Sequence, residues 1–189
     1  SRRDFVQTSA MLGGLLIAFR LMPRGIGATP ATPGAAPFAP NAFLRIAPDG
    51  AITIIAKHSE MGQGICTSIA MCVADELDAD WSRIKVEFAP IDPAYNRTDL
   101  GTQITGGSTS TRGSILQMRQ AGATARMMLL QAAAQQWSVS PSTLRTENGA
   151  VLAPDGRKAS YGSLVEAAAK LPSPTEVNLK EPGQFKLIG

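Results

Sequence analysis

Two loops rich in glycine and hydroxyl residues carry the groups that could bind a ligand. In the first, residues 60–64 (EMGQG), Gly62 and Gly64 flank Gln63. Glycine lets the backbone approach a ligand closely, and the glutamine amide both donates and accepts hydrogen bonds. This arrangement suits a flat heterocycle that has an amide edge. A plain turn between a strand and a helix uses the same residue types, and that alternative stays open.

The second loop, residues 105–111 (TGGSTST), lies at the start of an expected long helix. Small residues, hydroxyls and exposed N–H groups at a helix N-terminus favour an anion, typically a phosphate. Serine and threonine also cap helices without binding any ligand, so capping alone is the alternative. Neither a Walker loop nor a Gly-x-Gly-x-x-Gly fingerprint occurs in the chain, and the nucleotide sites that those motifs form are not expected.

The elements expected around these loops are strands and helices in mixed order. Residues 43–46 and 51–56 are apolar runs joined by the turn sequence APDG, which predicts a β-hairpin. Helical spacing of apolar residues predicts a helix over 65–77, and strict alternation predicts a half-buried strand over 81–89. A long helix is expected over 110–136, then short strands over 144–146, 150–153 and 157–159, and a helix over 161–171. We therefore expect an α+β fold of hairpin strands and two main helices.

An arginine stripe runs along the expected long helix. Arg112, Arg119 and Arg126 lie seven residues apart and nearly in line on one side. A solvated face and a contact with another subunit or domain both fit this spacing.

Charge and ligand counts exclude two classes of site. The net charge is +3, and four arginines and one aspartate in the first 24 residues account for all of it. The rest of the chain is balanced, so a basic nucleic-acid surface is not expected. One histidine and two cysteines, Cys66 and Cys72, form no motif for a structural zinc or an iron–sulfur cluster.

The N-terminal segment resembles a twin-arginine export signal. The sequence SRRDFV is followed by a mostly apolar run over 10–19, which is too short to span a bilayer unaided. An amphipathic surface helix with two chance arginines is the alternative. We expect a signal or anchor over residues 1–22, a Pro/Ala-rich linker over 23–40 and a folded domain over 41–189. Because no good Ala-x-Ala site follows the signal, we expect it to stay uncleaved. Twin-arginine export carries proteins that have already folded, so a signal of this kind indicates a protein that takes up a bulky cofactor before export.

Three stretches together resemble the molybdopterin-binding large subunit of the xanthine oxidase family. They are KHSEMGQG at 57–64, ELDADW at 76–81 and TGGSTS at 105–110. The similarity is greatest to the exported branch that includes isoquinoline 1-oxidoreductases and membrane-bound aldehyde dehydrogenases. It implies that residues 41–189 form the N-terminal part of a molybdopterin-binding domain.

The resemblance implies roles for the matching residues. The residues that match the pyranopterin-contacting loop are Met61, Gly62 and Gln63, with the amide of Gln63 bonded to the ring system. Those that match the segment beside the molybdenum centre and the cofactor phosphate, acting mainly through backbone N–H groups, are Gly106, Gly107, Ser108 and Ser110. No catalytic residue and no metal ligand is implied in this chain, because the family's glutamate base lies in a Gly-x-Gly-Glu motif that is absent here.

The resemblance also implies a reaction and partners. Family members hydroxylate electron-poor carbons with oxygen from water and pass the electrons to iron–sulfur clusters. We expect this chain to supply part of the molybdopterin site of an enzyme that oxidises aldehydes. Hydroxylation of N-heteroaromatic rings is the alternative reaction. The expected cofactor is molybdopterin, and its cytosine dinucleotide is one form that it could take. Expected partners are the remainder of the large subunit, an iron–sulfur small subunit and a membrane cytochrome c, carrying haem, or a quinone-linked acceptor. The expected location is the periplasmic side of the cytoplasmic membrane.

Three side chains in or beside the first loop are not expected to act as catalytic groups or metal ligands. Glu60 belongs to the pterin-loop match, so we do not assign it the role of the base. For His58, the only histidine, a structural role is expected rather than proton shuttling or contact with the cofactor. Met61 is expected to pack beside the pterin rather than bind a metal. A rival from another class is a non-catalytic exported binding or assembly module.

Overall fold

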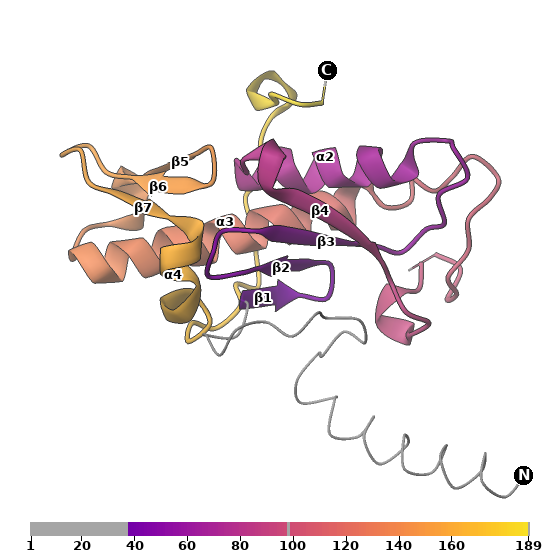
Figure 1. The fold of residues 1–189 in the computed structure, drawn as a ribbon, viewed down its shortest axis with the longest axis horizontal. Coiled ribbons are helices and arrows are strands. Elements are labelled where there is room, and N and C mark those ends of the chain that lie inside the picture. Colours follow the sequence, from indigo (N-terminus) through magenta and orange to yellow (C-terminus); the bar gives the residue numbers. More distant parts are fainter. Residues whose placement is uncertain (1–37, 98, 189) are drawn as a thin grey trace, which may run out of the picture. The chain divides into compact units, whose positions relative to one another are not determined.

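A computed structural model describes residues 38–97 and 99–188, which form two small sheets and three α-helices (Figure 1). The first sheet has the order β1-β2-β3-β4 and consists of β1 (Phe38–Asn41), β2 (Leu44–Ile46), β3 (Ile52–Ala56) and β4 (Ile84–Phe88). The second is antiparallel and consists of β5 (Arg145–Glu147), β6 (Ala150–Leu152) and β7 (Lys158–Ser160). The helices are α2 (Ile65–Leu77), α3 (Ile115–Trp137) and α4 (Tyr161–Ala168).

The expected α+β fold class is confirmed. The hairpin of β2 and β3 forms as predicted, with Leu44 opposite Ile54. β1 pairs with β2 and begins at Phe38, slightly before the start expected for the folded domain. The expected signal over 1–22 and the linker up to residue 37 lie outside the described residues.

β3, α2 and β4 form a parallel crossover that determines where the loops lie. β3 and β4 run parallel, with Ile54 paired with Val86, and α2 connects them. Parallel strands end at the same edge of a sheet, so the segments that follow β3 and β4 leave the sheet side by side. This is the edge at which both glycine loops are found.

The helices cover the sheet unevenly. α2 packs lengthwise on α3 and contacts β3, where Ile54 and Ile69 are completely buried. β4 was expected to be half-buried, but Val86 and Phe88 on its apolar face are 38% and 62% exposed. Among the described elements, none lies outside β4 in the sheet, which explains why its apolar row stays open. None of the helices in these residues is long and apolar enough to cross a membrane.

Close contact between α2 and α3 requires a glycine. A Cβ atom at position 122 would lie 2.5 Å from the carbonyl oxygen of Val73 and 2.9 Å from the Cβ of Glu76. Atoms do not approach so closely in a packed interior, so only Gly122 permits this separation of the two helices.

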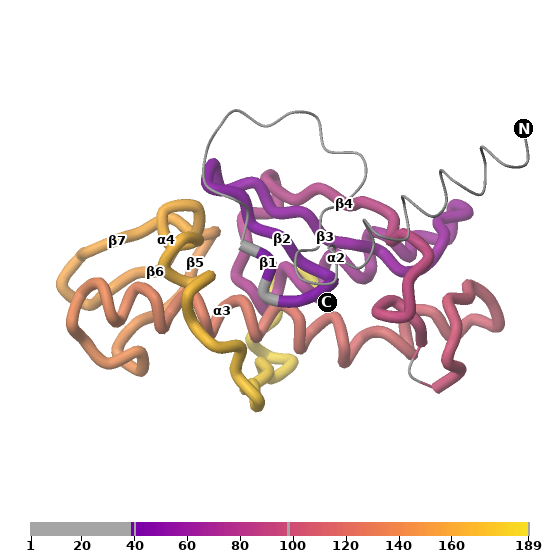
Figure 2. The backbone as a smooth tube through the Cα atoms, turned by 90° about the horizontal axis from the view of Figure 1, so that it is seen from below, coloured from indigo at the N-terminus to yellow at the C-terminus, as the bar shows by residue number. Residues whose placement is uncertain are grey.

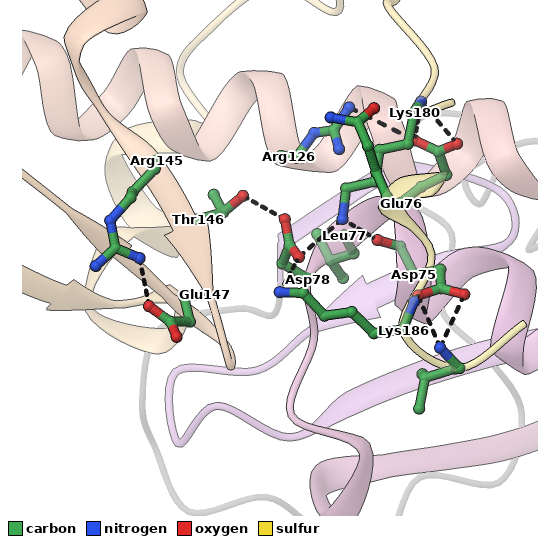
Figure 3. Close-up of polar contacts among 12 residues, drawn as sticks. Asp75, Glu76, Leu77, Asp78, Arg126, Arg145, Thr146, Glu147, Lys180 and Lys186 are labelled. Atoms are coloured by element: carbon green, nitrogen blue, oxygen red, sulfur yellow. Dashed lines mark hydrogen bonds and ion pairs between the residues drawn. The ribbon is translucent and has the colours of Figure 1, made fainter. Parts of the chain in front are cut away.

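The end of α2 holds the C-terminal segment through buried carboxylates (Figure 3). Asp75 accepts hydrogen bonds from the backbone N–H groups of Lys186, Leu187 and Ile188, at distances between 2.8 and 3.2 Å. The neighbouring Glu76 accepts the backbone N–H of Lys180 at 3.1 Å. These bonds explain why a segment whose regular structure is a single short 3₁₀ helix, Pro182–Gln184, lies in a defined place along α2.

The arginine stripe takes part in the same contact. The Glu76 carboxylate lies 2.8 Å from Nη2 of Arg119 and 3.5 Å from Nη2 of Arg126. Arg126 also donates to the carbonyl oxygen of Asn178 at 2.8 Å. For these two arginines the solvated-face alternative is therefore wrong, and the contact they make is with other parts of this chain rather than with another subunit or domain. Arg112 is exposed.

Candidate functional site

The two glycine loops are joined at their bases. The backbone N–H of Ser59 donates a hydrogen bond to Oγ1 of Thr105 at 2.8 Å. Figure 1 shows both loops at the end of the molecule where α2 and α3 begin, and Figure 2 shows the same neighbourhood from a perpendicular direction. Residues separated by more than forty positions in the sequence thus form one surface.

Glu60 fixes the shape of the first loop. Its carboxylate accepts hydrogen bonds from the backbone N–H groups of Gly62 at 2.8 Å, Gly64 at 3.0 Å and Cys66 at 3.0 Å. The bonds from Cys66 and Gly64 are the main reason that the pKa of Glu60 lies below its ordinary value. A carboxylate engaged in this way caps the start of α2, which is a structural role and not that of a catalytic base.

The Gln63 amide folds back on its own loop. Its Oε1 accepts the N–H of Met61 at 2.6 Å, and its Nε2 donates to the carbonyl oxygen of Ser59 at 2.9 Å. An amide has two N–H groups and two lone pairs on oxygen, so one of each stays available to a ligand. Gln63 is exposed, and Met61 is 71% exposed, so both can be reached from outside the loop.

The glycines of the first loop border open space. Gly62 and Gly64 have φ values of 89° and 80°, in the left-handed region that favours glycine. A Cβ atom at either position would meet nothing within 4 Å. The backbone here is therefore open to close approach by a ligand.

The second loop differs from the prediction in its relation to α3. The helix was expected from residue 110 but begins at Ile115, with Ser114 as its N-cap. Gly107 and Ser108 have φ values of 62° and 51°, which cannot belong to a right-handed helix, and a separate turn closes between Thr109 and Gly113. The segment over 106–110 therefore precedes the first turn of the helix instead of forming it.

Hydrogen-bond donors of the second loop are nevertheless free. Among the described residues, none accepts the backbone N–H groups of Gly106, Gly107, Ser108 and Ser110. The three residues over 106–108 are exposed and residue 110 is half-buried. Several unpaired N–H groups on one exposed turn are suited to an anion or a polar ring edge.

His58 lies beneath both loops. Its ring is buried, with Nδ1 at 2.9 Å from the carbonyl oxygen of Ile104 and Nε2 at 2.7 Å from Oγ of Ser114. Burial is the main reason that the pKa of His58 lies below its ordinary value. These contacts agree with the structural role expected from the sequence.

Arg97 is a buried residue that sequence analysis missed. It pairs with Asp99, with Nε at 3.0 Å from Oδ1, and its guanidinium also donates to Oγ1 of Thr109 in the second loop. A Cβ atom at Gly113 would lie 3.1 Å from Nη2 of Arg97, so the turn closes tightly over this side chain. Nothing in the sequence around Arg97 marks it as buried.

A cavity of about 400 Å³ opens beside the joined bases of the loops. Its lining comes from the ends of β3 and β4 and from the segment before the second loop, and includes Ser59, Phe88 and Thr105. The tips of the two loops lie outside this lining. In the described part of the chain, no group of three or more His, Cys, Asp or Glu residues could hold a metal ion.

Comparison with known proteins gives consistent results. Residues 17–187 match the family model of the molybdopterin cofactor-binding domain. The chain is 40% identical over 176 residues to the isoquinoline 1-oxidoreductase subunit beta of Brevundimonas diminuta, a match that covers 91% of this chain and 22% of that protein. It is 32% identical over 203 residues to the membrane-bound aldehyde dehydrogenase [pyrroloquinoline-quinone] of Gluconacetobacter polyoxogenes, covering 100% of this chain and 25% of that protein.

A solved structure shares the fold. The reconstituted CO dehydrogenase from Oligotropha carboxidovorans superposes with a TM-score of 0.51 and 22% identity, over 64% of this chain and 15% of that chain. At this identity the likeness supports the fold alone. The chain spans about a quarter or less of the length of the curated relatives it matches.

Proposed function

Because the chain belongs to the molybdopterin-binding subunits of the xanthine oxidase family, we propose that its two glycine loops hold one pyranopterin cofactor in a molybdenum hydroxylase. The observation that carries the proposal is the hydrogen bond between Ser59 and Thr105, which joins the two loops at their bases. When bound, the cofactor supplies the redox chemistry by which the family hydroxylates a carbon with oxygen from water. The residues of this chain bind and orient it.

The residues present fit such a group. The remaining N–H and lone pair of the Gln63 amide suit the polar edge of a pterin ring, and Gly62 leaves room for the ring to approach the backbone. The N–H groups of Gly106, Gly107, Ser108 and Ser110 suit the phosphate and the oxygen atoms beside the metal. Met61, which is exposed, would cover one side of the ring. The metal would be held by the cofactor.

For the substrate we propose aldehydes. The membrane-bound aldehyde dehydrogenase matches this chain along its whole length. N-heteroaromatic rings are the second candidate, favoured by the higher identity to the isoquinoline 1-oxidoreductase subunit. The base and the substrate pocket would lie in parts of the large subunit that the curated relatives have beyond the matched region.

For the partners we propose the remainder of the large subunit, an iron–sulfur small subunit, and a membrane cytochrome c or quinone-linked acceptor. Exposed apolar side chains support the remainder of the large subunit as a partner. In the described part of the chain, the exposed large apolar residues all fall between Met61 and Leu116 in the sequence, and most of them belong to β4, to the segment that follows it or to the start of α3. A covering protein is the usual explanation for such a surface. The SRRDFV sequence supports export by the twin-arginine route to the periplasmic side of the membrane.

Molybdenum analysis of the complete protein with a matched pair of variants tests the proposed function. Gly62 and Gly156 have φ values of 89° and 90°, and a Cβ atom at either would meet nothing within 4 Å. Alanine strains the backbone equally at both positions, by about 1 kcal/mol, but only Gly62 lies in a proposed cofactor loop. We expect Gly62→Ala to lower the molybdenum content and Gly156→Ala to leave it unchanged. Protein without molybdenum, or an equal effect of the two variants, would contradict the proposal.

Turnover with a redox dye distinguishes the substrate classes. The complete enzyme should reduce the dye with aldehydes. Reduction with isoquinolines but not with aldehydes would favour the second candidate and leave the cofactor proposal intact.

A further inference from the structure

His58 connects both ends of the second loop to the end of β3. Ile104, whose carbonyl oxygen lies 2.9 Å from Nδ1, directly precedes the loop. Ser114, whose Oγ lies 2.7 Å from Nε2, is the N-cap of α3 and directly follows the turn that ends the loop. A single buried ring therefore spans the two ends of the segment over 105–113.

The two partners fix the tautomer of the ring. A carbonyl oxygen can only accept, so Nδ1 of His58 carries the proton. In a neutral ring Nε2 is then an acceptor, and the Ser114 hydroxyl donates to it. Ser114 is completely buried and makes no side-chain hydrogen bond to its own helix, so its hydroxyl is committed to the histidine.

We propose that His58, as a neutral ring protonated at Nδ1, is a positioning residue that holds the second loop closed in its ligand-binding shape. The inference rests on the proposed function for the identity of the ligand, a molybdopterin. The geometry of the loop itself does not depend on that identity. Because the free N–H groups of the loop lie between the two points that His58 holds, release of either point changes their direction.

A second proton on the ring works against this arrangement. A proton on Nε2 turns this nitrogen from an acceptor into a donor, so the Ser114 oxygen must accept from it and the buried hydroxyl proton loses the histidine as its acceptor. The charged groups near the ring are Lys57 at the end of β3 and Arg97, paired with Asp99, from the segment before the loop. From α3, the side chains are the uncharged Ser114 and Gln117. Burial, and then the two cations, lower the pKa of His58. The ring is therefore neutral at its ordinary pKa of 6.5 and above, and the closed loop loses stability progressively as the pH falls from that value through the lower pKa of the folded protein.

Trypsin cleavage after Arg112 measures loop opening without reference to the cofactor. Arg112 is exposed and lies inside the segment that His58 closes. At pH 8 the complete protein with His58→Ala should be cut there about tenfold faster than the wild type, because the variant loses both hydrogen bonds of the ring and a tenfold change corresponds to about 1.4 kcal/mol. His58→Asn, which keeps an N–H near the position of Nδ1, should recover part of the difference. Equal cleavage rates for the wild type and His58→Ala would overturn the proposal.

Molybdenum retention between pH 5 and pH 8 is the second readout. The wild type should retain its metal above pH 6.5 and lose it progressively below, whereas His58→Ala should retain about tenfold less without that pH step. The same step in both proteins would overturn the inference while leaving the proposed function intact. Absence of molybdenum from the wild type at every pH would overturn the proposed function instead, and the trypsin rates would then decide on His58 alone.

Discussion

The backbone N–H of Ser59 donates to Oγ1 of Thr105, and this bond of 2.8 Å joins the two loops on which the proposed cofactor site depends. Thr105 also lies directly after Ile104, whose carbonyl oxygen His58 holds. The first loop and the second are therefore fixed to each other at their bases, through Ser59 and Thr105.

Thr105→Val should loosen the two loops. Valine has nearly the shape of threonine but cannot accept the N–H of Ser59, and a lost hydrogen bond of this kind is worth about 1 kcal/mol. We expect the cofactor to dissociate roughly fivefold faster, measured as molybdenum retained after dialysis. Thr67→Val, at an exposed position on α2, is the matched control and should behave as wild type. Equal retention by the two variants would show that the bond does not support the site.

Gly122→Ala should destabilise the contact between α2 and α3. Alanine favours an isolated helix by about 1 kcal/mol over glycine. Here its Cβ would lie 2.5 Å from the carbonyl oxygen of Val73, and overpacking of that kind costs about 1–3 kcal/mol. The cost of the clash exceeds the gain in helix propensity, so the melting temperature should fall. Gly183→Ala, where a Cβ would meet nothing within 4 Å, should leave it nearly unchanged. A raised melting temperature for Gly122→Ala would mean that the helices pack less closely than described.

Glu76→Gln should release the C-terminal segment from α2. Glu76 is completely buried and pairs with Arg119 and Arg126, and a buried pair that loses one partner costs about 3–5 kcal/mol. The expected result is faster proteolysis around Lys180, whose N–H also bonds to this carboxylate. Glu166→Gln removes an exposed pair with Lys170 and is the control, with an effect below about 1 kcal/mol. If both variants resist proteolysis equally, the buried pairs do not hold the segment.

Asp78 should make the stability of the protein depend on pH in the acid range. Burial alone would raise its pKa, but hydrogen bonds from Lys180, Thr146 and Lys186 together lower it below the ordinary value of 3.8. A carboxyl group whose pKa is lower in the folded state stabilises the protein fully above its unfolded value, and that contribution is lost as the pH falls through the folded value. The difference in urea midpoint between wild type and Asp78→Asn should therefore be largest near neutral pH and shrink below about pH 4. A constant difference across this range would refute the assignment.

Local patterns predicted most of the elements. The APDG turn and its apolar flanks predicted the hairpin of β2 and β3, and helical spacing predicted α2 with the bounds observed, 65–77. The start of α3 was wrong by five residues, because residues 109–114 form a separate turn before the helix, in which the N–H of Gly113 bonds to the carbonyl oxygen of Thr109. The alternation in β4 correctly predicted a strand but not its exposure, which depends on what covers the neighbouring face.

The candidate site was predictable only in part. Glycines and hydroxyls are visible in the sequence, so both loops could be selected and matched to a family. The contacts that position the loops could not be predicted, because Arg97 and Ser114 bond to residues that only the fold brings near them. The sequence did not predict the hydrogen bonds of Gln63 within its own loop either. The cofactor roles of the loop residues stay predictions.

An experimental structure of the complete, molybdenum-loaded protein tests the central claim most directly. We predict one pyranopterin located between the loops, with polar atoms about 3 Å from the amide of Gln63 and from the backbone N–H of Gly107. A pyranopterin that contacts only one of these loops, or neither, would contradict the account.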